Sequence, residues 1–160
     1  MVWASGNLFV IGGKDSSGQT SDEMNVYNPI TNQWSVGNSL PAPVRAADAV
    51  LLGNKIYLAG GSNDSSDNIS TFYVYDLSDQ NWVQKASLLT KGHGLALEIL
   101  DDKLWAIGGY HDKKRVEIYE PATDSWSSSN NLPHDRWWHR SWNYAGGMYI
   151  IGGVSGFNNS

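Results

Sequence analysis

The heptapeptide Lys55-Ile56-Tyr57-Leu58-Ala59-Gly60-Gly61 (KIYLAGG) decides the fold of this chain. It is a short apolar run that ends in two glycines. Three other stretches have the same form, and their glycine pairs are Gly12-Gly13, Gly108-Gly109 and Gly152-Gly153. The first glycines of successive pairs lie 48, 48 and 44 residues apart. A period in the range of roughly 20–50 residues indicates one structural unit that is repeated along the chain.

Further landmarks keep fixed distances within each repeat. A tyrosine is followed seven residues later by a tryptophan, and a leucine comes six residues after that. The three sets are Tyr27-Trp34-Leu40, Tyr75-Trp82-Leu88 and Tyr119-Trp126-Leu132. Only the segment between the second glycine and the tyrosine varies, with separations of 14, 14 and 10 residues. Loops tolerate changes of length and frameworks resist them, so this segment is expected to be an adaptable loop.

Four short strands are expected in each repeat. The apolar run at 55–59, with copies at 8–11, 104–107 and 148–151, suits a strand that is buried on both faces. The strands before it are expected at 46–52, 94–100 and 140–145. A third strand carries the tyrosine, as in 71–75, and a fourth begins at the tryptophan. A single sheet of this size cannot bury both faces, so the copies are expected to stack around an axis as a β-propeller.

These landmarks resemble the kelch repeat, in which an apolar strand, Gly-Gly, a variable loop, Tyr, Trp and a Leu-Pro step follow one another. The resemblance implies an all-β fold of about three kelch-type propeller blades, each a four-stranded antiparallel sheet, with an extra strand pair. The repeat units are roughly 1–40, 41–88, 89–132 and a partial 133–160, within a single domain 1–160. The Leu-Pro step becomes Leu88-Leu89 in one repeat, and the family's arginine sixteen residues before Gly-Gly is kept only as Arg136. The periodic tyrosines and tryptophans are expected to pack between the blades.

Composition narrows the classes of function. The chain has 160 residues, a net charge of −5, 41% hydrophobic and 17% charged residues, and no cysteine. It is therefore expected to fold rather than be disordered. An acidic chain is a poor candidate for nucleic-acid or membrane-surface binding. Neither a signal peptide nor an apolar membrane span is visible, which leaves the compartment open and favours the cytoplasm. No cofactor and no metal are expected.

The number of repeats is small for a closed ring. Propellers have roughly four to eight blades, so three blades and a strand pair form a partial ring, which would expose two apolar sheet faces. Three interpretations remain open. The chain is a piece of a longer kelch protein, or copies of it associate into a ring, or it is a small closed form.

The kelch resemblance also implies that the loops after Gly-Gly and the connections between blades crowd one face. The richest connection is 133–140 (PHDRWWHR), which combines arginine, histidine and tryptophan. Tryptophan and arginine are enriched at the energetic centres of interfaces. The candidate partner-binding residues are Arg45, Lys91, His93, Tyr110, His134, Arg136, Trp138, His139 and Arg140.

The leading hypothesis is therefore a non-catalytic binding or scaffold module that presents these loops to a protein or peptide. One alternative is a part of a carbohydrate-active kelch enzyme, such as a sugar-acid mutarotase or epimerase. The other is a self-assembling structural propeller unit. No catalytic residue is expected, because His134, Asp135 and His139 fit no metal signature. The copper oxidases of this fold need a cysteine, which the chain lacks.

Overall fold

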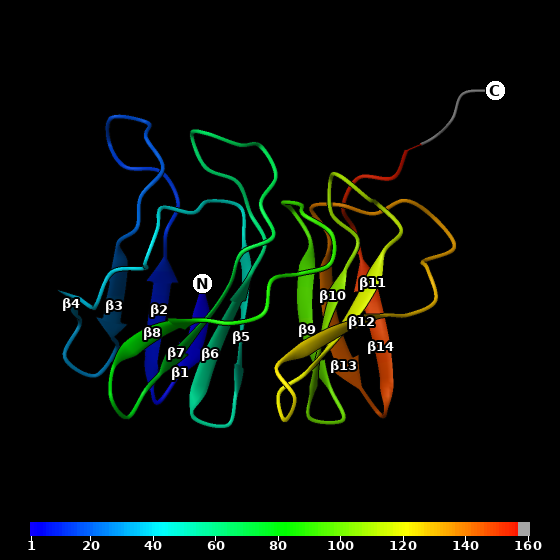
Figure 1. Cartoon of the computed structure of the whole chain (residues 1–160). Coiled ribbons are helices and arrows are strands. Elements are labelled where there is room, and N and C mark those ends of the chain that lie inside the picture. Colours follow the sequence, from blue (N-terminus) through cyan, green and yellow to red (C-terminus); the bar gives the residue numbers. More distant parts are fainter. Residues whose placement is uncertain (157–160) are drawn as a thin grey trace.

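The computed structural model describes residues 1–156, which form fourteen strands in four antiparallel sheets (Figure 1). Three sheets have four strands in the orders β1-β2-β3-β4, β5-β6-β7-β8 and β9-β10-β11-β12, and the fourth is the pair β13-β14. These described residues contain no helix, and so none that could span a membrane. The expected all-β fold of four-stranded antiparallel sheets with an extra strand pair is confirmed. The last residues of the predicted partial repeat 133–160, beyond 156, lie outside the described residues.

The strand bounds are β1 Val2–Ala4, β2 Asn7–Ile11, β3 Met24–Asn28, β4 Gln33–Val36, β5 Asp48–Leu52, β6 Lys55–Ala59, β7 Phe72–Asp76, β8 Asn81–Gln84, β9 Ala96–Leu100, β10 Lys103–Ile107, β11 Val116–Glu120, β12 Ser125–Ser128, β13 Arg140–Tyr144 and β14 Gly147–Ile151.

Two of the three innermost strands begin later than predicted. The strands expected at 46–52 and 94–100 begin at Asp48 and Ala96. The reason is a left-handed residue at the end of each blade connection: Ala46 has φ 55°, Gly94 φ 64° and Trp138 φ 56°. The N–H of Gly94 donates to the carbonyl of Ala46 at 3.0 Å, and the N–H of Trp138 donates to the carbonyl of Gly94 at 2.8 Å. Main-chain hydrogen bonds thus join neighbouring blades at this point.

The Gly-Gly pairs bind the connection to the next blade. The N–H of Gly61 donates to the carbonyl of Gly92 at 2.8 Å, and Gly13 and Gly109 donate to Val44 and Arg136 in the same way. The first glycine of the pair has a positive φ, 68° at Gly60, and a Cβ added there would lie 2.6 Å from the Gly92 carbonyl oxygen. Only glycine fits this approach without strain. The repeated pair is therefore a docking point for backbone.

The constant spacing between the tyrosine and the tryptophan reflects a β-hairpin. Tyr75 lies opposite Trp82 across β7 and β8, and the other two pairs have the same register. The indole N–H of Trp82 donates to the carbonyl of Asn38 in the preceding blade at 2.9 Å. The predicted inter-blade burial is found at Tyr75, Tyr119 and Trp126, but it is wrong for Trp34, whose side chain is 58% exposed. Trp34 is exposed because no blade packs on that side of β4 in the structure.

Two apolar clusters hold the blades together, one between the first and second sheets and one between the second and third. The ring does not close. Large apolar side chains are exposed at both ends of the arc, with Trp3, Trp34 and Val36 at the first blade and Tyr144 and Ile151 at the last strand pair. The strand predicted at 148–151 is part of β14, and it is only partly buried because β14 has a neighbouring strand on one side.

Candidate functional site

The loops that leave the Gly-Gly pairs lie together with the blade connections, as the kelch resemblance implied (Figure 1). We call this surface the loop face; it comprises the segments 14–22, 41–47, 62–71, 89–95, 110–115 and 133–139. Main-chain hydrogen bonds join these segments. The N–H of Tyr110 donates to the carbonyl of His93 at 2.9 Å, and the N–H of Arg136 donates to the carbonyl of Lys113 at 2.8 Å. The loop face is consequently one connected surface.

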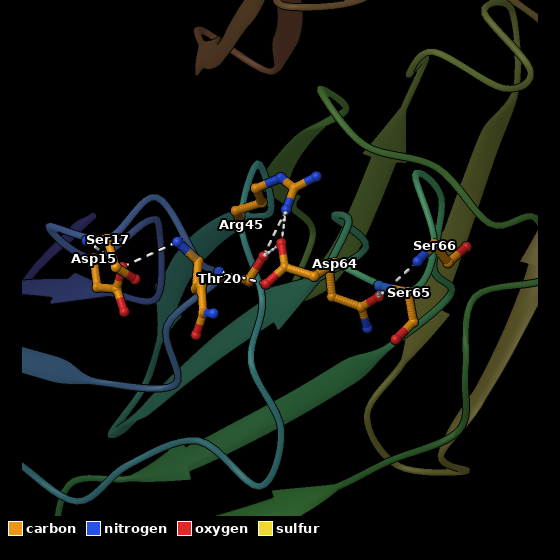
Figure 2. A network of polar contacts seen from close by, with 9 residues as sticks. Asp15, Ser17, Thr20, Arg45, Asp64, Ser65 and Ser66 are labelled. Atoms are coloured by element: carbon orange, nitrogen blue, oxygen red, sulfur yellow. Dashed lines mark hydrogen bonds and ion pairs between the residues drawn. The ribbon is translucent and has the colours of Figure 1, made fainter.

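At the first two blades the loop face is a satisfied polar network (Figure 2). Arg45 Nη1 donates to Thr20 Oγ1 and to Asp64 Oδ1, each at 2.6 Å. The N–H and the hydroxyl of Thr20 both donate to the Asp64 carboxylate at 2.8 Å. The hydrogen bonds from Thr20, followed by the contribution of Arg45, lower the pKa of Asp64. Arg45, a predicted partner-binding residue, is thus already paired within the chain.

The acidic and amide side chains of these loops mostly stabilise their own turns. Asp15 Oδ1 accepts from the N–H and hydroxyl of Ser17 and from the N–H of Gln19. The hydrogen bond from the Ser17 hydroxyl is the largest contribution that lowers the pKa of Asp15. Asn63 Oδ1 accepts from the N–H groups of Ser65 and Ser66 (Figure 2). Within residues 1–156, no three histidine or acidic side chains are grouped to hold a metal.

At the third and fourth blades the loop face carries aromatic rings. The rings of His93 and Tyr110 stack with centroids 4.9 Å apart, and Trp138 lies 5.5 Å from His93. Trp137 stands edge-on to Tyr110 at 6.1 Å, with an interplanar angle of 79°. We call these four residues the aromatic cluster. Tyr110 and Trp138 are about half exposed, at 49% and 53%. The cluster brings together three predicted site residues, His93, Tyr110 and Trp138.

A cation lies on this cluster. The ammonium nitrogen of Lys113 lies 4.6 Å from the ring centroid of Trp137 and 5.8 Å from that of Tyr110. Both distances are within the reach of a cation–π interaction. Neither Trp137 nor Lys113 was among the predicted site residues. The clue was present in the sequence, since Trp137 belongs to the PHDRWWHR segment and Lys113 to the one shortened loop.

The other predicted site residues are dispersed. His134 and Arg136 line a small cavity with Pro133, and Arg140 projects toward Asp48 with 3.6 Å between Nη1 and Oδ1. Lys91 is exposed. His139 is only 2% exposed, so its ring is not accessible to a partner on the loop face. It packs between blades at the position that Leu95 takes one repeat earlier, close to Gly108 and Gly153.

Burial also perturbs His139. Neither ring nitrogen has a hydrogen-bond partner within residues 1–156. Desolvation, followed by the positive charges of Arg136 and Arg140, lowers the pKa of His139 to about 4. The ring is therefore neutral at physiological pH, and its contribution is to packing.

A buried ion pair that the sequence analysis missed supports the connection carrying His93. Arg115 Nη1 lies 3.1 Å from Glu117 Oε1, and both side chains are almost fully buried. Arg115 also donates to the carbonyls of Gly108 and Thr90, while Glu117 Oε2 accepts from the N–H of Leu89 at 3.0 Å. The sequence contains a clue to this pair. Arg115 precedes β11 and Glu117 lies within it, whereas the equivalent positions of the preceding repeat, at the start of β7, are Thr71 and Tyr73.

Comparison with known proteins agrees with this architecture. The family model described as "KLHDC2/KLHL20/DRC7 Kelch-repeats domain" matches residues 1–158. The chain belongs to the kelch-repeat family. It is 31% identical over 157 residues to Kelch-like protein 36 of Bos taurus, covering 91% of this chain and 25% of that protein. It is 27% identical over 137 residues to Kelch-like protein 25 of Xenopus tropicalis, covering 84% of this chain and 23% of that protein.

A solved structure shows the same fold at lower sequence similarity. "Structure of YjhT" superposes on this kelch chain with a TM-score of 0.74 and 19% identity, covering 89% of this chain and 48% of that one. At this identity the likeness concerns the fold alone. The kelch chain spans about a quarter of the length of the two Kelch-like relatives. Its Gly-Gly docking points, hairpin tryptophans and loop face are therefore parts of a kelch architecture.

Proposed function

We propose that this kelch chain is a non-catalytic protein-interaction module, and that its loop face binds an acidic segment of a partner protein. The observation that carries the proposal is the aromatic cluster, where Tyr110 and Trp138 are half exposed on a framework of main-chain hydrogen bonds. Half-exposed aromatic side chains on rigid backbone offer large contact area at low entropic cost. The similarity to Kelch-like proteins supports the same assignment.

Charge around the cluster supports an acidic partner. The three segments that carry the cluster, 89–95, 110–115 and 133–139, contain the basic residues Lys91, Lys113, Lys114 and Arg136 beside the buried, paired Arg115. Their acidic residues are only Asp112 and Asp135, although the chain as a whole has a net charge of −5. Complementary charge accelerates association and selects partners.

The proposal is tested by titrating a panel of acidic peptides into wild type, Trp138→Ala and Arg136→Ala, with isothermal calorimetry. Truncating a central aromatic anchor is expected to weaken binding by at least about tenfold. Lys103→Ala is the matched control, because Lys103 is an exposed cation at the other end of β10, paired with Glu120. Equal affinities in all four proteins would show that the loop face does not bind these peptides.

One observation favours a second function, catalysis on a sugar acid. The inner strands place the carboxylates of Asp48 and Glu98 beside Arg140 in a cavity of about 380 Å³. Desolvation is the largest cause of the raised pKa of both Asp48 and Glu98, and perturbed carboxyls in a cavity are typical of acid–base sites. Incubation with a sugar acid, followed by NMR of both anomers, tests this function. An equilibration rate that is the same with wild type, with Asp48→Asn and without protein would eliminate it.

A further inference from the structure

The ammonium group of Lys113 occupies a corner between two aromatic walls. Trp137 and Tyr110 are nearly perpendicular, and the Lys113 nitrogen lies over the ring of each. Perpendicular aromatic rings around a cation are the arrangement that proteins use to hold ammonium ligands. Lys113 has no ion pair within residues 1–156, so the rings are the only charge-complementary group that holds it there. The side chain thus occupies a site shaped for a cation.

Hydrogen bonds hold the two aromatic residues of this corner, Trp137 and Tyr110, in place, but none within the described part of the chain holds the side chain of Lys113. Trp137 exchanges main-chain hydrogen bonds with Val154 at 3.2 and 2.8 Å, and Tyr110 donates its N–H to His93. The His93 ring is held in turn by Nδ1, which lies 2.6 Å from the carbonyl of Asp67. A carbonyl only accepts, so Nδ1 carries the proton. Lys113 is anchored by its main chain alone, through the carbonyl that accepts from Arg136.

We infer that Lys113 is an internal substitute for a ligand cation, and that the corner of Trp137 and Tyr110 is a subsite for a quaternary ammonium group. A primary ammonium is a compact and strongly hydrated ion. A trimethylated ammonium is more weakly hydrated and fills the space between two rings with its methyl groups. It therefore competes well for the corner, and Lys113 is free to leave because its side chain has no polar anchor.

This inference rests on the proposed function, because it takes the loop face to be the binding surface, and it adds a recognition element to it. The basic residues around the cluster would contact carboxylates of a partner segment. The corner would accept a trimethylated lysine of that segment. Such a segment carries charges of both signs, which distinguishes it from a merely acidic one.

The test uses tetramethylammonium chloride as the probe and the ring-current shift of its methyl protons as the readout, with potassium chloride as the ionic-strength control. Wild type is compared with Lys113→Ala, which empties the corner. Lys114→Ala is the matched control, because it removes the same charge from the same loop but no ring contact. Loss of the competing side chain is expected to tighten binding by about two- to fivefold in Lys113→Ala alone.

Two wall variants complete the design. Tyr110→Ala and Trp137→Leu are each expected to abolish the tetramethylammonium shift, and Tyr110 is sufficiently exposed for its removal to leave the fold intact. Equal affinities of Lys113→Ala and Lys114→Ala, or an undiminished shift in Tyr110→Ala, would overturn the subsite. Such a result with acidic-peptide binding retained would contradict this inference alone. If the wild type also failed to bind acidic peptides, the proposed function would be contradicted as well.

Discussion

The indole N–H of Trp126 donates to the main-chain carbonyl of Ala86 at 2.8 Å, across the boundary between two blades. The carboxylate of Asp124 accepts the N–H of the same alanine at 3.0 Å. One residue of the second blade is therefore held at both of its polar backbone groups by the third blade. The pair Trp82 and Asn38 repeats half of this arrangement at the preceding boundary.

Replacing Trp126 by phenylalanine is expected to lower the free energy of unfolding by about 1–3 kcal/mol, because the carbonyl of Ala86 loses its donor in a partly buried place. Urea denaturation followed by circular dichroism measures it. Trp34→Phe is the control, since the Trp34 side chain is exposed and faces no blade in the structure. Its effect is expected within about 0.5 kcal/mol. Similar losses for both variants would contradict the role of the indole N–H.

The glycine docking point makes a second prediction. Gly60→Ala is expected to cost more than about 3 kcal/mol, because a positive φ and a close approach to the Gly92 carbonyl coincide there. Gly53→Ala shares the positive φ, 60°, but its added methyl meets nothing within 4 Å. About 1 kcal/mol is expected for it. The denaturation midpoints of the two variants, measured side by side, test this prediction. Equal midpoints would show that the positive φ alone, and not the close approach to the Gly92 carbonyl, causes the loss of stability.

The buried His139 predicts a pH dependence. Its pKa is about 4 in the folded chain, against 6.5 ordinarily, so the unfolded chain binds the proton first as the pH falls. The contribution of His139 to the free energy of unfolding is therefore complete above pH 6.5. It declines as the pH falls from 6.5 to about 4 and changes no further below that. The full loss amounts to about 3 kcal/mol. The charged groups that lower this pKa, Arg136 and Arg140, keep their charge throughout the range.

His139→Leu isolates this contribution, because Leu95 shows that leucine fits the equivalent place in the preceding blade. The difference in unfolding free energy between wild type and His139→Leu is expected to vary between pH 4 and 6.5 and to be constant above it. If the difference did not change with pH across that range, folding would not lower the pKa of His139.

The open ends of the arc predict self-association. Trp34 and Val36 at one end and Tyr144 and Ile151 at the other are exposed apolar side chains, and such surfaces associate in water. The mass from light scattering is expected to rise with protein concentration, and Trp34→Lys is expected to reduce that rise. A monomeric mass at every concentration, with unchanged tryptophan fluorescence, would show that the arc is stable alone.

The repeat and its strands were predictable because they depend on residues whose spacing is visible, such as Gly60 and Trp82. The aromatic cluster was only partly predictable. The sequence predicts His93, Tyr110 and Trp138 as partner-binding residues, but their stacking depends on hydrogen bonds between segments that no sequence pattern reports. His139 shows the limit most clearly. Its burial follows from the packing of Gly108 and Gly153 around it, while its neighbours in the sequence resemble a binding loop.

The hydrogen bonds from Gly94 to Ala46 and from Trp138 to Gly94 form a chain of main-chain contacts along the inner side of the arc. These bonds use no side chain, whereas the Asp48 carboxylate, which also lines the inner cavity, accepts from the N–H of Leu97 in the next blade at 3.0 Å. A different residue at such a position would remove a side-chain contact but leave the main-chain bonds in place. One kelch framework can therefore line its centre with different chemistry.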